Sequence, residues 1–478
     1  MGFYSFIGFL RPAIYFFLLP VYVAYFSEAE YAIYNLMIDF AAISMVLVSL
    51  KINNSMVTHY YDYMDDPQAQ EDLLSNLFTI SILIGLVTIG IAWFGGTPLF
   101  ELVFKDEAVT FFPYGLIVLA YTVLFEANQC YLTFLKNRKK IIAFTMVMLT
   151  HVLSIVLLQF IFIIVLERGV TGALEGILIG NILVTAVMII MKPGLISFKF
   201  NTKYIAEALK FSIPLIPYMI IYWFLMRGGR FFLEAYTDLD TVAVFAMLMV
   251  LASVIILAVE AVINGIRPFL FEEFARGEAA SKQYISLLTR LVINIPLIFV
   301  PLIILISCFI HLIIIKESYF VISEYMPWAC LLIFLMVWYK LFYQQLIFVK
   351  KSVQVTVLSL IAMLCLLIGF VYFIPSYGIY GVLAATIIAN LVMVVLFYYY
   401  AQKNYYVAYS FKSILVNPLL VFACIFALYF GRLHYSWSWE LFGLLQFFAA
   451  LLLIVVLNFG NMKEYIDFFR KGSLHSHS

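Results

Sequence analysis

The sequence predicts an all-α polytopic membrane protein. Of its 478 residues, 65% are hydrophobic and 12% are charged, whereas soluble globular domains are about 45–50% apolar and about 25% charged. Apolar runs of about twenty residues recur along the whole chain, and this is the length that a helix needs to cross a bilayer. Two internal sequence matches indicate two parallel six-helix repeats, an N-lobe and a C-lobe, around a central cavity, with two extra helices at the C-terminus.

Polar breaks divide the apolar sequence into fourteen predicted transmembrane helices. Their limits are 3–26, 31–58, 72–95, 109–135, 141–166, 170–191, 207–235, 240–266, 283–314, 319–349, 352–374, 378–401, 413–431 and 440–460. The longest gaps between them are too short for a folded domain, which excludes a soluble catalytic module. The first segment lacks the charged start and cleavage site of a signal peptide, so we expect it to be retained as a helix.

Charge and cysteine content exclude several other functions. The net charge of +1 gives no sign of a nucleic-acid partner. The five cysteines lie in apolar segments without a CxxC spacing, so we expect core residues rather than disulfides or a thiolate metal site. The histidines show no metal-ligand spacing either, and the sequence predicts no cofactor.

Basic residues predict the orientation, because short loops rich in lysine and arginine stay in the cytoplasm. Nineteen of the 28 basic residues lie in loops, in a tail or toward helix ends that are cytoplasmic if the N-terminus is inside, and five others are assigned to the interior of the predicted helices. The remaining four, on the outer side, are Lys105, Arg168, Lys316 and Arg432. We therefore expect both termini in the cytoplasm. The loop 58–73 departs from the pattern because it is acidic, but acidic residues contribute little to this rule.

The repeats appear in two alignments. The segment GVTGALEGILIGN (169–181) aligns with GIYGVLAATIIAN (378–390) at an offset of 209 residues, and 113–136 aligns with 327–350 at an offset of 214. The fourth predicted helix therefore corresponds to the tenth, and the sixth to the twelfth. A six-helix unit begins and ends on the same side of the membrane, so its duplication gives parallel repeats. The alternative is that both matches reflect only the packing of small residues between helices.

Charged residues inside the predicted helices are the candidate functional residues. Arg227 and Arg230 share one face of the helix 207–235, and each charge near the bilayer centre costs roughly 2.5–3.5 kcal/mol. That face is expected to line a wet cavity, although snorkelling at the interface is an alternative for the basic residues. The five basic residues predicted to bind substrate are Arg11, Lys51, Arg227, Arg230 and Lys340. The three acids singled out with them are Asp39, Glu126 and Glu260, which leaves an excess of +2 among these eight residues.

The acidic residues are predicted to serve in gating or ion coupling. Glu126 and Lys340 occupy equivalent positions in the two repeats, at the offset of 214. They either pair across the lobes in one state of the transporter or pair within their own lobes. Asp39, and Glu260 near Asn264, either titrate or hold a coupling ion, or else neutralise an arginine. The sequence leaves open whether a coupling ion would be a proton or sodium.

Three segments resemble a known family. RPAIYFFLLPVYVAYFSEAEYAIYNL (11–36) and FSIPLIPYMIIYWFLMRGGRFFLEAYTDLDTVAVFAM (211–247) are similar to the starts of the two lobes of Wzx-type polysaccharide repeat-unit flippases. IPSYGIYGVLAATIIAN (374–390) resembles the beginning of their twelfth helix. These flippases are a branch of the multidrug, oligosaccharidyl-lipid and polysaccharide exporter superfamily. Two features depart from the family: Gly229 stands where an aspartate is frequent, and the chain starts almost inside its first helix.

The resemblance implies a non-enzymatic flippase in the bacterial inner membrane. Its substrate would be an undecaprenyl-diphosphate-linked oligosaccharide, translocated by alternating access for O-antigen and lipopolysaccharide assembly. Its partners would be membrane lipids and the polysaccharide polymerase and assembly proteins. The implied domains are an N-lobe at 1–200, a C-lobe at 201–405, and accessory helices with a cytoplasmic tail at 406–478.

Two other functions compete with this one. The first is an ion-coupled multidrug or small-solute exporter with parallel repeats, but export of cations would favour an anionic cavity, and residues 1–26 contain no acid. The second is a membrane-embedded glycosyltransferase or polymerase. Such enzymes usually place catalytic residues on a large outer loop, and every predicted outer loop is short.

Overall fold

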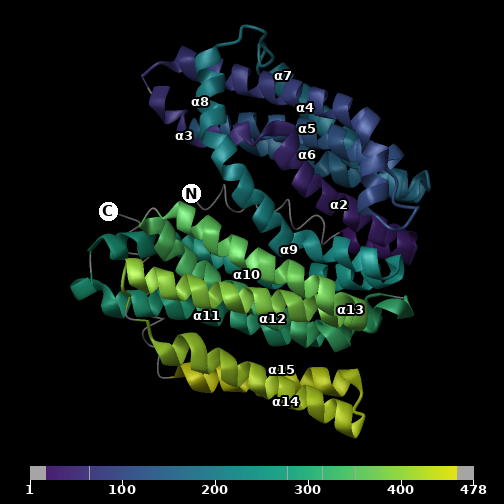
Figure 1. The fold of residues 1–478 in the computed structure, drawn as a ribbon, viewed down its shortest axis with the longest axis vertical. Coiled ribbons are helices and arrows are strands. Elements are labelled where there is room, and N and C mark those ends of the chain that lie inside the picture. The colour runs from purple at the N-terminus through teal and green to yellow at the C-terminus, as the bar shows by residue number, and fades with distance from the viewer. Residues whose placement is uncertain are drawn as a thin grey trace. The chain divides into compact units, whose positions relative to one another are not determined.

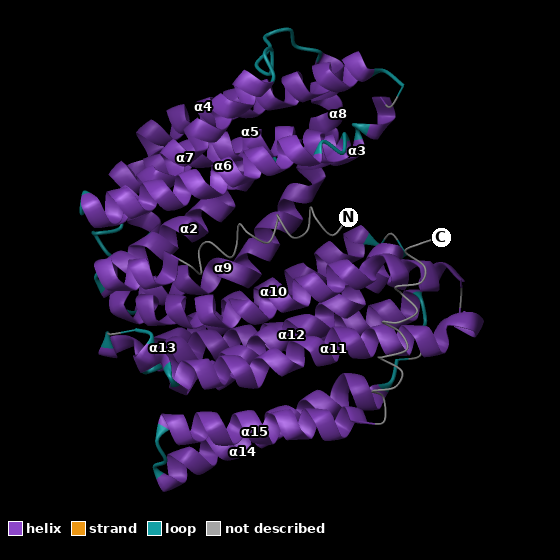
Figure 2. Ribbon diagram, turned by 180° about the vertical axis from the view of Figure 1, so that it is seen from behind, coloured by secondary structure: helices purple, strands orange, loops and turns teal. Residues whose placement is uncertain are grey.

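The protein is built from helices. A computed structural model describes residues 18–459 except 64, 277, 315, 350 and 408, with only the backbone of 58, 261, 264–269, 271–276, 278–284 and 286. Every regular element in the described residues is helical (Figure 2). Twelve helices of this part of the chain are long and apolar enough to cross a membrane. The predicted fold class, an all-helical polytopic membrane protein, is therefore confirmed.

The chain packs as two compact units, and the boundary between them falls between Ala243 and Val244. Within the first unit, α2, α4, α5, α6 and α7 run side by side as a bundle (Figure 1). The short helix α8 leads into α9, which packs against α2. The helices of this unit are α2 (Glu28–Ser49), α3 (Ser55–Thr58), α4 (Pro67–Val103), α5 (Leu116–Asn137), α6 (Ile141–Phe160), α7 (Gly169–Met191), α8 (Thr202–Ser212) and α9 (Ile216–Tyr236).

The second unit is a bundle to which a helical hairpin is attached. The hairpin packs mainly through α15 on α11, where the Gln446 side chain donates a hydrogen bond to the Pro301 carbonyl oxygen (2.9 Å). It corresponds to the two predicted accessory helices. The helices of this unit are α10 (Leu239–Arg276), α11 (Glu278–Cys308), α12 (Ile322–Phe348), α13 (Ser352–Asn404), α14 (Asn417–Tyr435) and α15 (Trp439–Asn458).

One predicted helix boundary was wrong, and another coincides with a kink. The predicted helix 31–58 ends early, because Leu50 and Lys51 adopt left-handed backbone angles (φ 45° and 53°), and a 3₁₀ turn and α3 follow. The helices predicted at 352–374 and 378–401 both lie in α13, and non-helical backbone angles at Gly378 divide this element at the predicted break. This long helix contains two of the predicted crossings, and residues 3–17 of the first predicted helix lie outside the described residues.

The two aligned glycine motifs have the same local geometry. Gly169 and Gly378 both adopt positive φ angles (53° and 52°), which residues with a Cβ rarely adopt. Gly172 and Gly381 both lie against the backbone of the preceding helix. A Cβ atom added to them would meet a phenylalanine carbonyl oxygen at 3.0 Å and 2.4 Å, respectively. The same turn therefore starts the sixth and the twelfth predicted helices, as the repeat requires.

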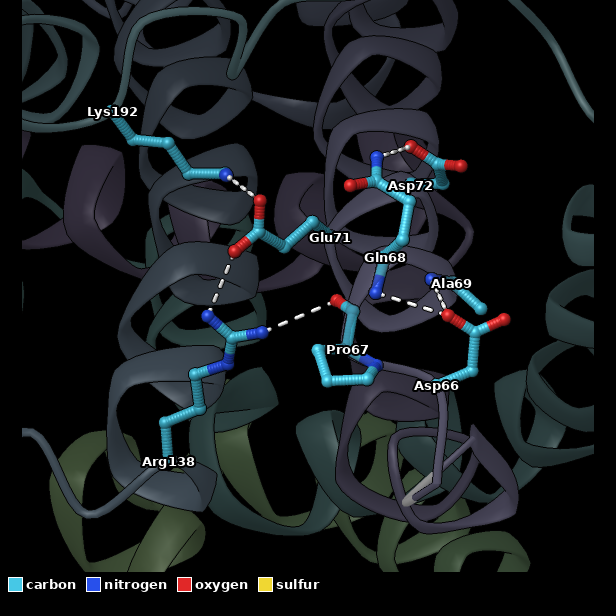
Figure 3. A network of polar contacts seen from close by, with 8 residues as sticks. All are labelled: Asp66, Pro67, Gln68, Ala69, Glu71, Asp72, Arg138 and Lys192. Atoms are coloured by element: carbon cyan, nitrogen blue, oxygen red, sulfur yellow. Dashed lines mark hydrogen bonds and ion pairs between the residues drawn. The ribbon is translucent and has the colours of Figure 1, made fainter.

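A polar network joins the ends of three helices of the first unit (Figure 3). Glu71 on α4 accepts hydrogen bonds from Arg138 after α5 (2.8 Å) and from Lys192 after α7 (3.0 Å). A second guanidinium nitrogen of Arg138 donates to the Pro67 carbonyl oxygen at 3.2 Å. The acidic loop 58–73 thus lies at the same end of the unit as these two basic residues, as the predicted topology requires.

The same acidic loop is attached to α8 through a tyrosine. The Tyr63 hydroxyl donates a hydrogen bond to the Glu207 carboxylate at 3.1 Å, and the Lys203 ammonium lies 5.7 Å from the centre of its ring. Burial and the bond to this carboxylate raise the pKa of Tyr63 to about 12. The hydroxyl therefore stays protonated near neutral pH and can keep donating this bond.

Candidate functional site

The candidate site is centred on one face of α9. Pro217 lies near the start of this helix, where a missing N–H is tolerated. Trp223, Arg227 and Arg230 follow at spacings of four and three residues, so they lie along one stripe. This stripe faces α2, because the Trp223 indole N–H donates a hydrogen bond to the backbone carbonyl oxygen of Asp39 (2.9 Å).

Asp39 joins both arginines. Arg227 Nη1 forms an ion pair with Asp39 Oδ1, and Arg230 Nη1 donates to Asp39 Oδ2 at 2.5 Å. The Asp39 side chain is completely buried (0% exposed), whereas Arg227 is 41% and Arg230 is 12% exposed. A buried carboxylate is strongly unfavourable without such partners. The sequence analysis allowed that Asp39 neutralises an arginine, and the structure shows it shared by two.

The triad of Arg227, Arg230 and Asp39 has a formal net charge of +1. It also keeps donor capacity, because a guanidinium has five N–H groups. The Nε–H of Arg230 is buried and has no hydrogen-bond partner among the described residues. Arg227 presents a partly exposed side chain at the same carboxylate. The triad thus keeps one N–H donor that no described residue uses.

Glu234 extends the α9 stripe, and the sequence analysis missed it. Its buried carboxylate accepts hydrogen bonds from the backbone N–H groups of Lys105 (2.8 Å) and Asp106 (2.7 Å), just after α4. At the other end, Ser212 donates a hydrogen bond to the Lys51 carbonyl oxygen (2.9 Å). Helix α9 and the turn before it are thus attached to the first unit along their length. The spacing of Glu234, four residues after Arg230, was the available signal.

A second ion pair in the first unit joins Lys51 to Glu126. The Lys51 ammonium lies 2.8 Å from Glu126 Oε1, and the Ser49 hydroxyl lies 3.0 Å from Oε2. Glu126 is nearly fully buried, with 2% of its side chain exposed. The left-handed turn at Leu50 and Lys51 directs the chain so that this lysine reaches α5. Glu126 therefore pairs within its own unit.

The second unit contains the corresponding ion pair between Lys340 on α12 and Glu260 on α10. Lys340 is 12% exposed and Glu260 is 42% exposed. Lys340, like Glu126, thus pairs within its own unit, which was one of the two predicted arrangements. Pairing of Glu126 with Lys340 in another state stays a prediction. Arg11 and the side chain of Asn264 lie outside the described residues, so their predicted roles stay predictions as well.

Sequence comparison gives one family. The sequence profile of the family described as "Polysaccharide biosynthesis protein" matches residues 2–272, which is more than half of the chain. This range includes Asp39, Arg227 and Arg230. None of the curated proteins matches the chain significantly in sequence.

Solved structures with the same fold are transporters. A multidrug resistance MATE family transporter of the MOP superfamily, in an inward-facing conformation, is similar with a TM-score of 0.68 and 16% identity, covering 82% of this chain and 94% of that one. The lipid II flippase MurJ, in an inward closed conformation, gives a TM-score of 0.67 and 14% identity, covering 94% and 100% of the two chains. At these identities the likeness shows the fold alone: this chain has a MATE- and MurJ-like transporter fold.

Proposed function

Because this chain belongs to the polysaccharide biosynthesis protein family, we propose that it is a flippase for undecaprenyl-diphosphate-linked oligosaccharides. It would move these repeat units across the cytoplasmic membrane by alternating access, for assembly of cell-surface polysaccharide such as O-antigen. The single observation that carries the proposal is the triad of Arg227, Arg230 and Asp39, which combines a positive charge with an unused donor in a helical bundle. In this proposal the triad binds the diphosphate.

Guanidinium groups suit a diphosphate. Each can donate two parallel N–H bonds to a phosphate, and these charge-assisted bonds are stronger than those between neutral groups. A bound diphosphate would also neutralise the excess charge of the triad, which is costly in an apolar environment. Arg11, Lys51 and Lys340 stay proposed contacts for the substrate. Lys51 and Lys340 would have to exchange their carboxylate partners for phosphate oxygens.

The proposed transport cycle uses the two sequence repeats. We assign residues 1–200 to an N-lobe, 201–405 to a C-lobe and 406–478 to an accessory segment, with both termini in the cytoplasm. The polymerase and assembly proteins that use the translocated glycan are the proposed partners. The coupling ion, proton or sodium, is not assigned.

The alternative is a multidrug exporter, which the fold shared with a MATE family transporter supports. Cationic drugs are the substrates for which the α9 triad is least suited, because its two arginines outnumber its one carboxylate and the net positive charge would repel a cation. An anionic lipid-linked substrate is therefore favoured.

The proposal is tested by leaflet exchange in proteoliposomes that contain the full chain and a fluorescent undecaprenyl-diphosphate oligosaccharide. The wild type should make the outer and inner pools accessible to a membrane-impermeant quencher. Each of Arg227→Ala and Arg230→Ala should slow exchange about 10–100-fold, because one charge-assisted hydrogen bond contributes about 1.5–3 kcal/mol. Lysine at either position should restore only part of the rate, since it lacks the planar fork.

Arg168→Ala is the matched control. Arg168 also pairs with a carboxylate in the first unit, Glu175 at 2.8 Å, but it takes no part in the triad. Its loss should leave exchange within about twofold of wild type. Wild-type rates in the double variant Arg227→Ala with Arg230→Ala would remove the triad from the mechanism. Efflux of a cationic drug without exchange of the lipid would support the exporter instead.

A further inference from the structure

The two guanidiniums assigned to the diphosphate are held by a single carboxylate. A carboxylate and a phosphate present similar oxygen pairs to arginine, so they bind to the same donors. We propose that Asp39 is a built-in competitor of the substrate: it binds Arg227 and Arg230 in the unloaded transporter, yields them to the diphosphate, and takes them back on release. This inference rests on the proposed function, and it assigns to Asp39 the control of substrate affinity and release.

The geometry allows the exchange to proceed in steps. Asp39 contacts each arginine through one Nη atom and a different carboxylate oxygen, so neither guanidinium is bound by a bidentate pair with it. Arg227 is the more exposed of the two, and the incoming anion would meet it first. The Nε–H of Arg230 is buried and has no partner in the described residues, so it becomes a second donor for the anion once the side chain of Arg230 moves. The diphosphate can therefore begin to contact the arginines before Asp39 has released them. The exchange needs no intermediate in which the arginines lack an anionic partner.

The position of Asp39 opposes its permanent displacement. Its side chain is fully buried, and the neighbouring Trp223 donates to its backbone carbonyl oxygen rather than to its carboxylate. A carboxylate that loses both arginines there would be a buried, unpaired charge, which is strongly unfavourable. This penalty and the repulsion between two anions at one site weaken substrate binding and favour release. A flippase needs weakened binding and easy release, because substrate that binds too tightly is not delivered.

The consequence is an unusual response to one substitution. Asp39→Asn removes the competing charge and keeps the shape of the side chain. It should tighten binding of undecaprenyl diphosphate about tenfold, equivalent to about 1.4 kcal/mol. At the same time it should slow leaflet exchange of the lipid-linked oligosaccharide about tenfold, because release becomes limiting. A residue with only a structural role would weaken both.

Binding is measured by microscale thermophoresis on the purified full chain, with undecaprenyl diphosphate as the probe and undecaprenyl monophosphate for comparison. Two variants serve as controls. Asp39→Glu keeps the charge and should bind within about threefold of wild type. Glu175→Gln removes another carboxylate of the first unit, one that pairs with Arg168 rather than with the two arginines, and it should leave affinity within about twofold. Thermal unfolding of each variant identifies those that fail to fold.

The outcomes separate the two proposals. Tighter binding with slower exchange in Asp39→Asn supports the competitor. Equal or weaker binding in a folded Asp39→Asn, or equal tightening in Glu175→Gln, overturns it while the flippase proposal stands. If Asp39→Asn does not fold, the smaller neutral variant Asp39→Ser decides, because it also removes the competing charge and must tighten binding if competition operates. If Arg227→Ala and Arg230→Ala bind the probe like wild type, the proposed function itself fails.

Discussion

The two sequence repeats hold equivalent ion pairs with the charges reversed. In the first unit the cation Lys51 follows α2 and the carboxylate Glu126 lies on α5, whereas in the second the carboxylate Glu260 lies on α10 and the cation Lys340 on α12. The partners correspond at separations of 209 and 214 residues, the offsets at which the repeated motifs align. Under the proposed repeat, the second and fourth helices of each copy are joined by an ion pair, with the order of the charges reversed.

The two pairs differ in their surroundings. Lys51 stands in a left-handed turn where α2 ends, whereas Glu260 lies within α10, which continues to Arg276. Glu126 is nearly fully buried and has the Ser49 hydroxyl beside it, but Glu260 is 42% exposed. A buried ion is costly to leave unpaired, and a partly exposed one is not. The first pair should therefore matter more for stability and the second should open more easily.

The largest effect is expected from exchanging charges between the repeats. Glu126→Lys combined with Lys340→Glu leaves Lys51 facing a lysine and Glu260 facing a glutamate. The loss should exceed the ~3–5 kcal/mol that one unpaired buried charge costs, so yield and leaflet exchange should fall below those of either single variant, Glu126→Gln or Lys340→Gln. Exchange restored above both single variants would instead show that Glu126 and Lys340 pair with each other during transport.

The next effect compares the loss of each lysine. Lys51→Met leaves Glu126 buried without its cation and should lower the free energy of unfolding by ~3–5 kcal/mol. Lys340→Met leaves the partly exposed Glu260 and should lower it by ~0–1 kcal/mol. Thermal or denaturant unfolding in detergent measures both. Lys51→Met with Glu126→Leu should recover most of the loss, and equal losses in the two single variants would contradict the difference in burial.

The smallest effect concerns the paired glycines. Gly381→Ala would place a Cβ 2.4 Å from a backbone carbonyl oxygen, against 3.0 Å for Gly172→Ala. Overpacking of this kind costs about 1–3 kcal/mol, so both should destabilise and Gly381→Ala should destabilise more. Gly90→Ala is the control, because nothing lies within 4 Å of its added Cβ, and it should be neutral or slightly stabilising. A larger loss of stability in Gly172→Ala than in Gly381→Ala would contradict this expectation. It would show that the residues around Gly381 move more easily to accommodate the added Cβ.

Much of the fold could be predicted from the sequence because its signals are local or repeated. Apolar length marks the spans, and the GxxG motifs at 169–172 and 378–381 mark equivalent turns, which the structure shows with matching positive φ angles. The end of α2 had no such signal. Leu50 and Lys51 are neither glycine nor proline, and their left-handed angles occur where Lys51 forms its pair with Glu126, a contact between distant segments.

In the candidate site, too, the sequence did not predict contacts between distant segments. All of its charged members except Glu234 were identified from the sequence, because a charge in an apolar segment is conspicuous. Their partners were not, since Asp39 and Arg227 are 188 residues apart and their contact depends on how α2 and α9 are rotated about their axes. The offset that relates Glu126 to Lys340 identified equivalent positions, but equivalence under the repeat does not determine which residues touch.

The attachment of α9 also bears on how such a chain arose. The repeat makes α9 the first helix of the second copy, yet its Trp223, arginines and Glu234 all bind segments of the first copy. A six-helix ancestor ending before this helix would have carried Asp39 as an unpaired carboxylate within the bilayer. Such an ancestor would have needed a second molecule to supply the arginines. Fusion of the two genes would then have made an obligatory association permanent within one chain.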